Sequence, residues 1–171
     1  LAHRGMKQVD WRPEWNVLDI GCGGGANVKR LLKLCPQGKV YGMDLSEESV
    51  AFARRHNAGE LDRRCFIQQG DVCSLPYGDG AFDAVTAFET VYFWSSVSKA
   101  LAEVFRVIRK GGCFLISLEA SDPELGKAWT ERIKGMTVYG AEELKQLLSQ
   151  AGFSDIRVIQ KKEELHIVAH K

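Results

Sequence analysis

The sequence carries almost no net charge and has no long apolar run. Its 23 Lys and Arg residues nearly balance its 22 Asp and Glu residues, which leaves a formal charge of +1. Proteins that bind nucleic acid or anionic membranes usually present a basic surface, so neither partner is expected here. The apolar runs are much shorter than the roughly 18 residues that a membrane span requires. The start of the chain also lacks the basic and apolar pattern of a signal peptide.

Cysteine is sparse and scattered. No C-x-x-C pair occurs among the five cysteines, which are Cys22, Cys35, Cys65, Cys73 and Cys113. Neither a disulfide framework nor a metal site is therefore expected, and a reduced, cytoplasmic setting fits best. The 171 residues, 45% hydrophobic and 26% charged, suit a soluble globular protein with one domain over 1–171. Because the chain opens with Leu1, we interpret 1–14 as part of an N-terminal cap that begins upstream.

One-sided helices alternate with short apolar strands along most of the chain. Apolar residues at positions i, i+3, i+4 and i+7 predict helices over 28–35, 101–108 and 144–151. A further helix is expected after Ser46, which is a good N-cap. Short apolar runs predict strands over 17–20, 40–43, 65–67, 84–88 and 113–116. This alternation is typical of an α/β fold, in which helices cover both faces of a parallel sheet.

The last part of the chain follows a different pattern. Strands over 156–160 and 165–169 are joined by a polar stretch, which predicts an antiparallel hairpin at the edge of the sheet. His166 and His170 alternate with apolar residues on the last strand, so both are predicted to face solvent. The stretch 120–139 has the weakest pattern, and we expect a helix over 123–133 followed by a loop.

A glycine-rich turn joins the first strand to the helix that follows it. The run V-L-D-I-G-C-G-G-G-A (17–26) has four glycines within five positions. Glycine lets the backbone turn tightly and approach a ligand closely, and the helix N-terminus suits an anionic group. Gly21, Gly23 and Ala26 also satisfy the dinucleotide fingerprint. The turn alone therefore leaves a nicotinamide cofactor open.

Carboxylates follow or lie within the predicted strands near this turn. Asp44 ends the second strand, 23 residues after Gly21, where a carboxylate accepts hydrogen bonds from ribose hydroxyls in several adenosine-ligand families. Asp19 lies on a buried strand, where it would repel a pyrophosphate but pair with an ammonium group, directly or through water. Asp71 follows the third strand and suits an adenine amino group, with Val72 against the ring. Asp44 and Asp71 also have ordinary structural interpretations, as a loop carboxylate and a turn residue.

Four segments together resemble one family. They are 17–26, V-Y-G-M-D-L-S (40–46), the stretch from Gly70 to Val85, and R-V-I-R-K-G-G-C-F-L-I-S (106–117). In this order they resemble class I S-adenosylmethionine-dependent methyltransferases of the methyltransferase-11, UbiE-like type. One departure is Lys110, which stands where the family usually has proline before a pair of glycines. We expect this change to make a turn less rigid and not to affect the site that binds S-adenosylmethionine.

The resemblance implies a Rossmann-like three-layer sandwich with a seven-stranded, mostly parallel sheet and an antiparallel C-terminal hairpin. It also implies S-adenosyl-L-methionine as the cofactor. The residues expected to contact it are Asp19, Gly21, Cys22, Gly23, Asp44, Leu45, Gly70, Asp71, Val72 and Glu89.

The end of the fourth strand holds the candidates for chemistry. Methyl transfer is an in-line displacement, so the protein mainly positions the reactants, and a base is needed only where the acceptor must lose a proton. Glu89 is the candidate catalytic residue, although it could equally be a capping or solvated carboxylate. Tyr92, Phe93 and Trp94 are candidates for the wall of an acceptor pocket, with packing beneath the next helix as the alternative.

These patterns favour an enzyme that transfers a methyl group to an unidentified, small-molecule acceptor. One alternative is an NAD(P)-dependent oxidoreductase that uses the same glycine turn, although the sequence lacks a recognisable Tyr-x-x-x-Lys pair. The other alternative is a non-catalytic protein that binds an adenosine ligand. Acceptor selection in such folds depends on loops, which here are 1–14, 89–94 and 119–140.

Overall fold

A computed structural model describes residues 1–124 and 126–171. In chain order the helices and strands are α1 (Ala2–Met6), β1 (Val17–Ile20), α2 (Ala26–Leu34), β2 (Val40–Asp44), α3 (Glu47–His56), β3 (Cys65–Gln69), β4 (Phe82–Phe88), the 3₁₀ helix η1 (Val91–Phe93), α4 (Val97–Val107), β5 (Ile108–Leu118), α5 (Lys127–Thr130), α6 (Ala141–Gln150), β6 (Ser154–Lys161) and β7 (Glu164–His170).

The strands form one seven-stranded sheet in the order β3-β2-β1-β4-β5-β7-β6. Strands β1 to β5 run parallel to their neighbours among themselves, whereas β7 is antiparallel to both β5 and β6. The predicted fold, with five parallel strands and an antiparallel C-terminal hairpin, is therefore confirmed. The direction in which strands are added reverses between β1 and β4, and ligands in open parallel sheets bind at such a point, outside the carboxyl ends of the strands.

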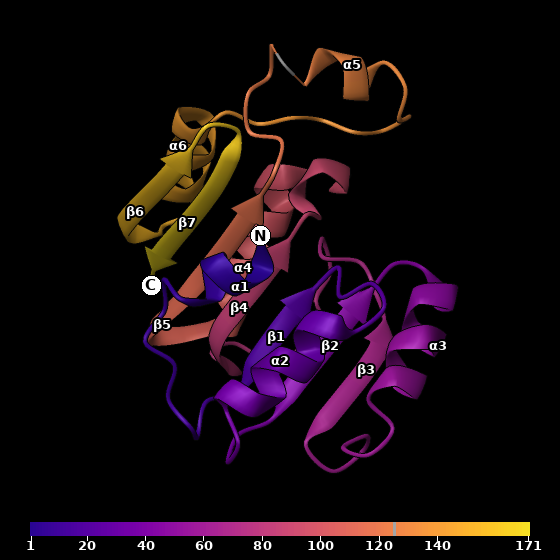
Figure 1. The fold of residues 1–171 in the computed structure, drawn as a ribbon. Coiled ribbons are helices and arrows are strands. Elements are labelled where there is room, and N and C mark those ends of the chain that lie inside the picture. The colour runs from indigo at the N-terminus through magenta and orange to yellow at the C-terminus, as the bar shows by residue number, and fades with distance from the viewer. Residues whose placement is uncertain (125) are drawn as a thin grey trace.

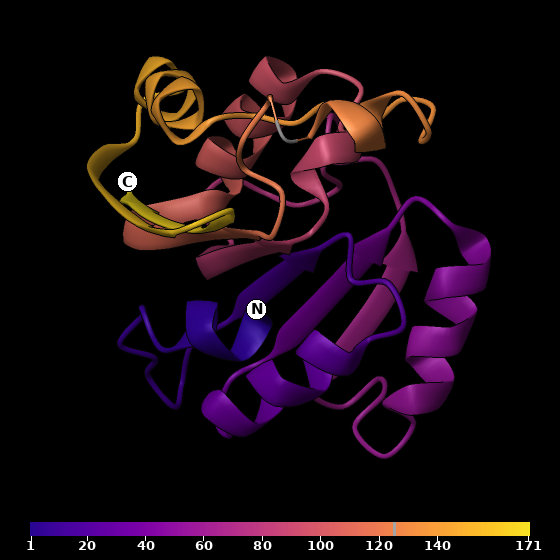
Figure 2. The ribbon, with the colours of Figure 1, turned by 45° about the horizontal axis from the view of Figure 1, so that its top comes forward.

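Helices cover both faces of the sheet, as Figures 1 and 2 show. On one face, Val17 of β1 belongs to the same core cluster as Leu31 of α2. On the other face, Leu18 of β1 clusters with Leu101 of α4 and Leu144 of α6. Alternate residues of β1 thus enter opposite layers, which is the period-2 pattern of a strand buried on both sides. No helix in the described ranges is long and apolar enough to cross a membrane.

The helix predicted over 123–133 is wrong in its extent. Within the described part of this stretch, the structure has only the four-residue α5, Lys127–Thr130, and Leu125 lies outside the described residues. Trp129 is 52% exposed and Ile133 is 37% exposed, so this segment buries little apolar surface. Short helices gain most of their stability from packing, which explains why the helix stays short.

The predicted boundary after α4 also shifts. The sequence favours a helix to 108 and a strand from 113, but α4 ends at Val107 and β5 begins at Ile108. Ile108 is fully buried and pairs with Phe82 at the start of β4. Because Ile108 pairs with β4, it belongs to strand β5 and not to helix α4.

The prediction that His166 faces solvent is wrong. His166 is only 4% exposed, and its Nδ1 lies 2.9 Å from Ser117 Oγ while its Nε2 lies 2.8 Å from Glu164 Oε1. Strand β7 lies between β5 and β6 rather than at the edge. The face of His166 is also covered by α1, where a Cβ on Gly5 would lie 3.1 Å from His166 Nδ1. His170, at the end of β7, is half-buried.

Candidate active site

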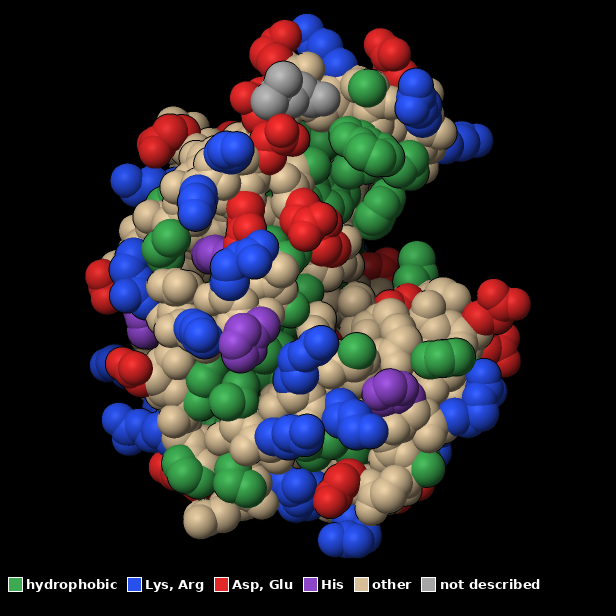
Figure 3. All heavy atoms as spheres, in the orientation of Figure 1, with side chains coloured by type: hydrophobic (Ala, Val, Ile, Leu, Met, Phe, Trp, Pro, Cys, Tyr) green, Lys and Arg blue, Asp and Glu red, His purple; other side chains and the backbone are tan. Residues whose placement is uncertain are grey.

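A cavity of about 580 Å³ lies at the carboxyl ends of the parallel strands. This volume falls within the range of small-molecule sites, roughly 300–1,000 Å³. Its lining residues are Ile20, Gly21, Met43, Asp44, Leu45, Ser46, Gly70, Asp71, Val72, Glu89, Thr90, Phe93, Trp94 and Ser95. Figure 3 shows a hollow between the part of the molecule that carries α5 and the part that carries α3, with acidic side chains on its floor.

Nine residues named from the sequence line this cavity, and four do not. The residues outside its lining are Asp19, Cys22, Gly23 and Tyr92. The Gly23 amide nevertheless donates a hydrogen bond to Asp44, which does line the cavity. Lining residues that the sequence analysis missed are Ile20, Met43, Ser46, Thr90 and Ser95. Each of them is next in sequence to a predicted site residue. Their position, for most of them near the end of a strand, could therefore have been used to predict them.

The glycine turn holds the backbone of Gly21 close to Thr90. Gly21 has φ +67°, and a Cβ at this position would lie 2.1 Å from Thr90 Oγ1. The backbone amides of Gly21 and Cys22 donate to the Met43 carbonyl at 2.7 and 3.0 Å, which ties β1 to β2. Both the conformation and the close contact thus require glycine at this point.

Asp44 is held in place at the end of β2. Its Oδ2 accepts a hydrogen bond from the Gly23 amide at 2.8 Å, and its Oδ1 accepts one from the Ser46 amide at 3.0 Å. A carboxylate oxygen can accept more than one hydrogen bond, so each oxygen keeps capacity for a ligand. Two such oxygens on a cavity wall suit a pair of neighbouring hydroxyl groups.

Asp19 does not line the cavity, although Ile20, the next residue of β1, does. The Asp19 side chain is 1% exposed, and its Oδ1 accepts a hydrogen bond from Thr86 Oγ1 at 2.7 Å. Its Oδ2 is buried without a hydrogen-bond partner among the described residues. Burial raises the pKa of Asp19 to about 7, the Thr86 hydrogen bond lowers it, and the charge of Asp44 raises it further. A buried carboxylate oxygen of this kind needs a donor, such as a water molecule or an ammonium group.

The cavity wall also combines apolar side chains with a further carboxylate. Leu45 is 69% exposed although it is a large hydrophobic residue, and Val72 is 7% exposed. Asp71 Oδ1 accepts a hydrogen bond from the Cys73 amide at 2.8 Å, which fixes the carboxylate beside Val72. Apolar surface next to a hydrogen-bond acceptor suits a heteroaromatic ring that carries an amino group.

Glu89 follows β4 in a strained backbone conformation. Its φ is +58°, a value that residues with side chains rarely adopt and that often marks functional sites. Glu89 Oε1 accepts hydrogen bonds from the Glu119 amide at 2.6 Å and from Tyr92 Oη at 3.2 Å. The surrounding protein raises the pKa of Glu89 by desolvation, although these two hydrogen bonds lower it.

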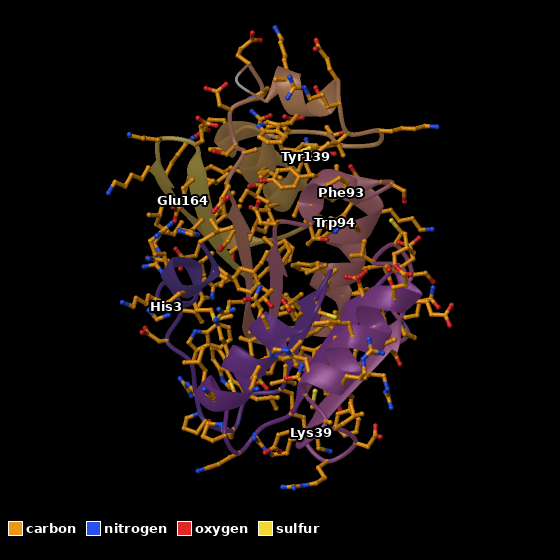
Figure 4. The ribbon with its side chains drawn as sticks, turned by 45° about the vertical axis from the view of Figure 1, so that its right-hand side comes forward. His3, Lys39, Phe93, Trp94, Tyr139 and Glu164 are labelled. Atoms are coloured by element: carbon orange, nitrogen blue, oxygen red, sulfur yellow. The ribbon has the colours of Figure 1, made fainter. Side chains whose placement is uncertain are left out.

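The three aromatic residues of 92–94 lie in different surroundings. Phe93 is 51% exposed and Trp94 is 9% exposed, and both line the cavity. The Trp94 ring also stacks on Phe114 with 6.4 Å between ring centroids, so it packs against the core as well. Figure 4 shows Phe93 and Trp94 close together, below Tyr139. Tyr92 instead lines an adjoining cavity.

Comparison with known sequences gives a family match. Residues 18–116 match the family described as a methyltransferase domain. The chain is 36% identical over 120 residues to demethylmenaquinone methyltransferase of Symbiobacterium thermophilum, covering 69% of this chain and 47% of that protein. It is 35% identical over 136 residues to the ubiquinone/menaquinone biosynthesis C-methyltransferase UbiE of Dinoroseobacter shibae, covering 74% of this chain and 54% of that protein. The chain thus spans about half the length of these relatives.

Comparison with solved structures agrees. A SAM-dependent methyltransferase from Aquifex aeolicus has a TM-score of 0.81 and 26% identity, covering 98% of this chain and 88% of that chain. The family match covers more than half of this chain and includes the glycine turn, Asp44, Asp71 and Glu89. The chain therefore belongs to the methyltransferase-domain family, the class I S-adenosylmethionine-dependent methyltransferases of the UbiE-like type.

Proposed function

We propose that this chain transfers the methyl group of S-adenosylmethionine to a small-molecule acceptor by in-line displacement. The observation that carries the proposal is the cavity beside the reversal of strand order. Asp44 and Asp71 lie on its wall, and Asp19, next to the lining residue Ile20, has a buried oxygen without a hydrogen-bond partner among the described residues. Family membership identifies S-adenosylmethionine as the cofactor. The names of the relatives specify more than one acceptor, including demethylmenaquinone and fatty acids, so they do not select one for this chain.

The residues present fit this cofactor. The buried Asp19 Oδ2, which lacks a donor among the described residues, fits its ammonium group, directly or through a water molecule. Asp44 would accept hydrogen bonds from the ribose hydroxyls, and Asp71 would accept one from the adenine amino group. The adenine ring would lie against Leu45 and Val72, whereas Gly21, Cys22, Gly23 and Gly70 would supply backbone at close approach. When bound, the cofactor supplies a methyl group activated by a positively charged sulfur.

The residues around Glu89 would position the acceptor and keep water out. Phe93 and Trp94 contribute apolar surface to the cavity wall beside Glu89. Glu89 is held by the Glu119 amide and Tyr92 Oη, so its carboxylate can orient an acceptor or take up a proton at a defined place. Because direct displacement depends mostly on alignment, this positioning is the main contribution that we assign to the protein.

The direct test compares ligands by thermal unfolding. S-adenosylhomocysteine at about 100 times its Kd should stabilise the native state by about 2.7 kcal/mol, which raises the Tm by about 5–10 °C. NADH and NADPH at the same concentration should leave the Tm unchanged, because Asp19 disfavours a pyrophosphate. A Tm rise with NADH but none with S-adenosylhomocysteine would support the oxidoreductase alternative instead. Binding without transfer of a labelled methyl group to any of a broad acceptor panel would support a non-catalytic protein.

The raised pKa of Asp19 predicts a proton release on ligand binding. With a pKa of about 7, about half of the ligand-free molecules carry a proton on Asp19 at pH 7. An ammonium group near Oδ2 favours the ionised form, so binding of S-adenosylhomocysteine should release about half a proton per site at pH 7. The measurement is the calorimetric binding enthalpy in buffers of different ionisation enthalpy.

The matched variant is Asp19→Asn, which keeps the shape of the side chain and the oxygen facing Thr86. It should show no proton release, and proton release equal to that of the unchanged protein would contradict the assignment. The ligand-free protein gives a second readout. The pKa of Asp19 is higher in the folded than in the unfolded chain, so this group lowers stability progressively as the pH rises from about 4 to about 7. Asp19→Asn should remove that contribution.

A further inference from the structure

A second cavity of about 580 Å³ adjoins the cofactor cavity. Its lining residues are Glu89, Tyr92, Glu119, Ala120, Trp129, Met136, Lys161, Lys162, Glu163 and Glu164. Glu89 lines both cavities, so the two are adjacent at this residue. A molecule in the second cavity would therefore reach the cofactor cavity at Glu89.

The charge of the second cavity is negative where it meets the first. The Glu119 amide donates to Glu89 Oε1 at 2.6 Å, which places the two glutamates next to each other. No Lys or Arg among the described residues lines the cofactor cavity. Lys161 and Lys162 line the second cavity from the turn of the β6–β7 hairpin. Figure 4 shows Glu164, which begins β7, on the opposite side from Phe93 and Trp94.

At least two of the four glutamates that line the second cavity have carboxylate oxygens that accept no hydrogen bond from a described residue. Glu164 is paired with Arg4, whose Nε lies 2.6 Å from Glu164 Oε1, and it also contacts His166. At Glu89, both hydrogen bonds from described residues go to Oε1, which leaves Oε2 for a ligand. Glu119 is exposed in the same cavity. Neither Glu89 nor Glu119 forms an ion pair within 4 Å with a described residue, although the charge of Arg4 acts on Glu119 and Lys161 and Lys162 line the same cavity.

Aromatic and apolar side chains complete the wall. Trp129 on α5 is 52% exposed, and Met136 is half-buried beside the same cavity. The Tyr92 ring is held in place because its Oη donates to Glu89 and accepts a hydrogen bond from the Ala120 amide at 2.9 Å. Carboxylates together with open aromatic faces are the features that bind organic cations.

We propose that this second cavity is the acceptor site and takes a protonated amine with an apolar body, its nitrogen lying between Glu89 and Glu119. The inference rests on the proposed methyl transfer and adds the class of acceptor. A carboxylate or phosphate acceptor would meet two like charges at the reacting end. A protonated amine meets opposite charges there and apolar surface along the rest of its length.

The chemistry balances without a further reactant. A protonated amine has no free lone pair, so one N–H bond must first break, and Glu89 takes the proton. Its desolvated position, which raises the pKa of Glu89, makes it a better proton acceptor than an ordinary glutamate. The nitrogen lone pair then forms the N–C bond to the methyl group while the S–C bond breaks and its electron pair stays on sulfur. The products are a methylated ammonium ion, S-adenosylhomocysteine and one proton, which Glu89 returns to solvent.

The test uses probes of similar shape and different charge on the chain saturated with S-adenosylhomocysteine. Calorimetry compares phenethylamine with 2-phenylethanol and 3-phenylpropanoate, which have similar apolar bodies but no positive charge. We expect the amine to bind at least tenfold more tightly than the alcohol, and the carboxylate not to bind. Glu119→Gln should weaken amine binding about tenfold, and Trp129→Leu about threefold. Both residues are exposed, so neither substitution should endanger the fold.

The matched control is Glu124→Gln, because Glu124 is exposed, pairs with Lys127 at 2.6 Å and does not line the cavity. It should leave amine binding unchanged. Equal binding of the amine and the alcohol, or equal effects of Glu119→Gln and Glu124→Gln, would overturn the inference and leave the proposed methyl transfer standing. Failure of S-adenosylhomocysteine itself to bind would overturn both. With the cofactor and an amine panel, mass spectrometry should find amines that are one methyl group heavier.

Discussion

Replacing Asp44 by alanine should weaken the binding of S-adenosylhomocysteine about 100-fold. The two Asp44 oxygens are fixed by the amides of Gly23 and Ser46, on the wall of the cavity. Hydrogen bonds to a charged group contribute about 1.5–3 kcal/mol each, so losing two to the ribose removes about 3 kcal/mol. Loss of the carboxylate also leaves the Gly23 amide without this acceptor. Isothermal titration calorimetry measures the change directly.

The control for this prediction is Asp79→Ala. Asp79 is an aspartate with an 83% exposed side chain that pairs with Arg106 at 3.0 Å, away from the cavity lining. This exposed ion pair contributes little to the free energy of unfolding. Both the affinity for S-adenosylhomocysteine and the Tm should therefore stay nearly unchanged. Equal affinities of Asp44→Ala and Asp79→Ala would show that the ribose does not lie at Asp44.

Replacing Gly25 by alanine should lower the free energy of unfolding by about 3 kcal/mol. Gly25 is the N-cap of α2 and has φ +78°, where an alanine costs about 1–2 kcal/mol. Its Cβ would also lie 2.6 Å from Asn57 Nδ2 and 2.9 Å from Ala53 Cβ, on or just beyond α3. Overpacking of this kind typically costs about 1–3 kcal/mol. Urea unfolding followed by circular dichroism measures the loss.

The comparison variant is Gly78→Ala. A Cβ at Gly78 would meet no heavy atom of the described residues within 4 Å, and this glycine is exposed. Its substitution should change the free energy of unfolding by no more than about 0.5 kcal/mol. If Gly25→Ala were as mild as Gly78→Ala, the close packing of α3 against the glycine turn would be refuted.

Much of the fold could be predicted because its signals are local. A strand buried on both faces needs consecutive apolar residues, as in 17–20, and a helix that covers a sheet needs one apolar stripe, as in 144–151. The predicted hairpin depends on two short strands joined by polar residues, and β6 and β7 confirm it. Where the local signal was weak, over 123–133, the prediction of a long helix failed.

Part of the lining of the cofactor cavity could be predicted from the sequence for the same reason. Parallel strands place their carboxyl ends at one edge of the sheet, so residues that follow strands, such as Asp44, Asp71 and Glu89, were expected near one another. All three line the cavity. Thr90 was missed because its role depends on contact with Gly21, which lies 69 positions earlier in the chain (90 minus 21).

Local residue patterns were enough to predict the order of most strands and helices along the chain, most of the faces that they bury, and the carboxylates at the strand ends. Three features became visible only in the folded chain. Asp19 is enclosed, with one oxygen that has no partner among the described residues; α1 covers His166; and Glu89 lines two cavities. The physical reason is the range of the interactions. Periodicity and turn residues act over a few neighbouring positions, whereas burial and cavity walls depend on which distant segments the sheet brings together.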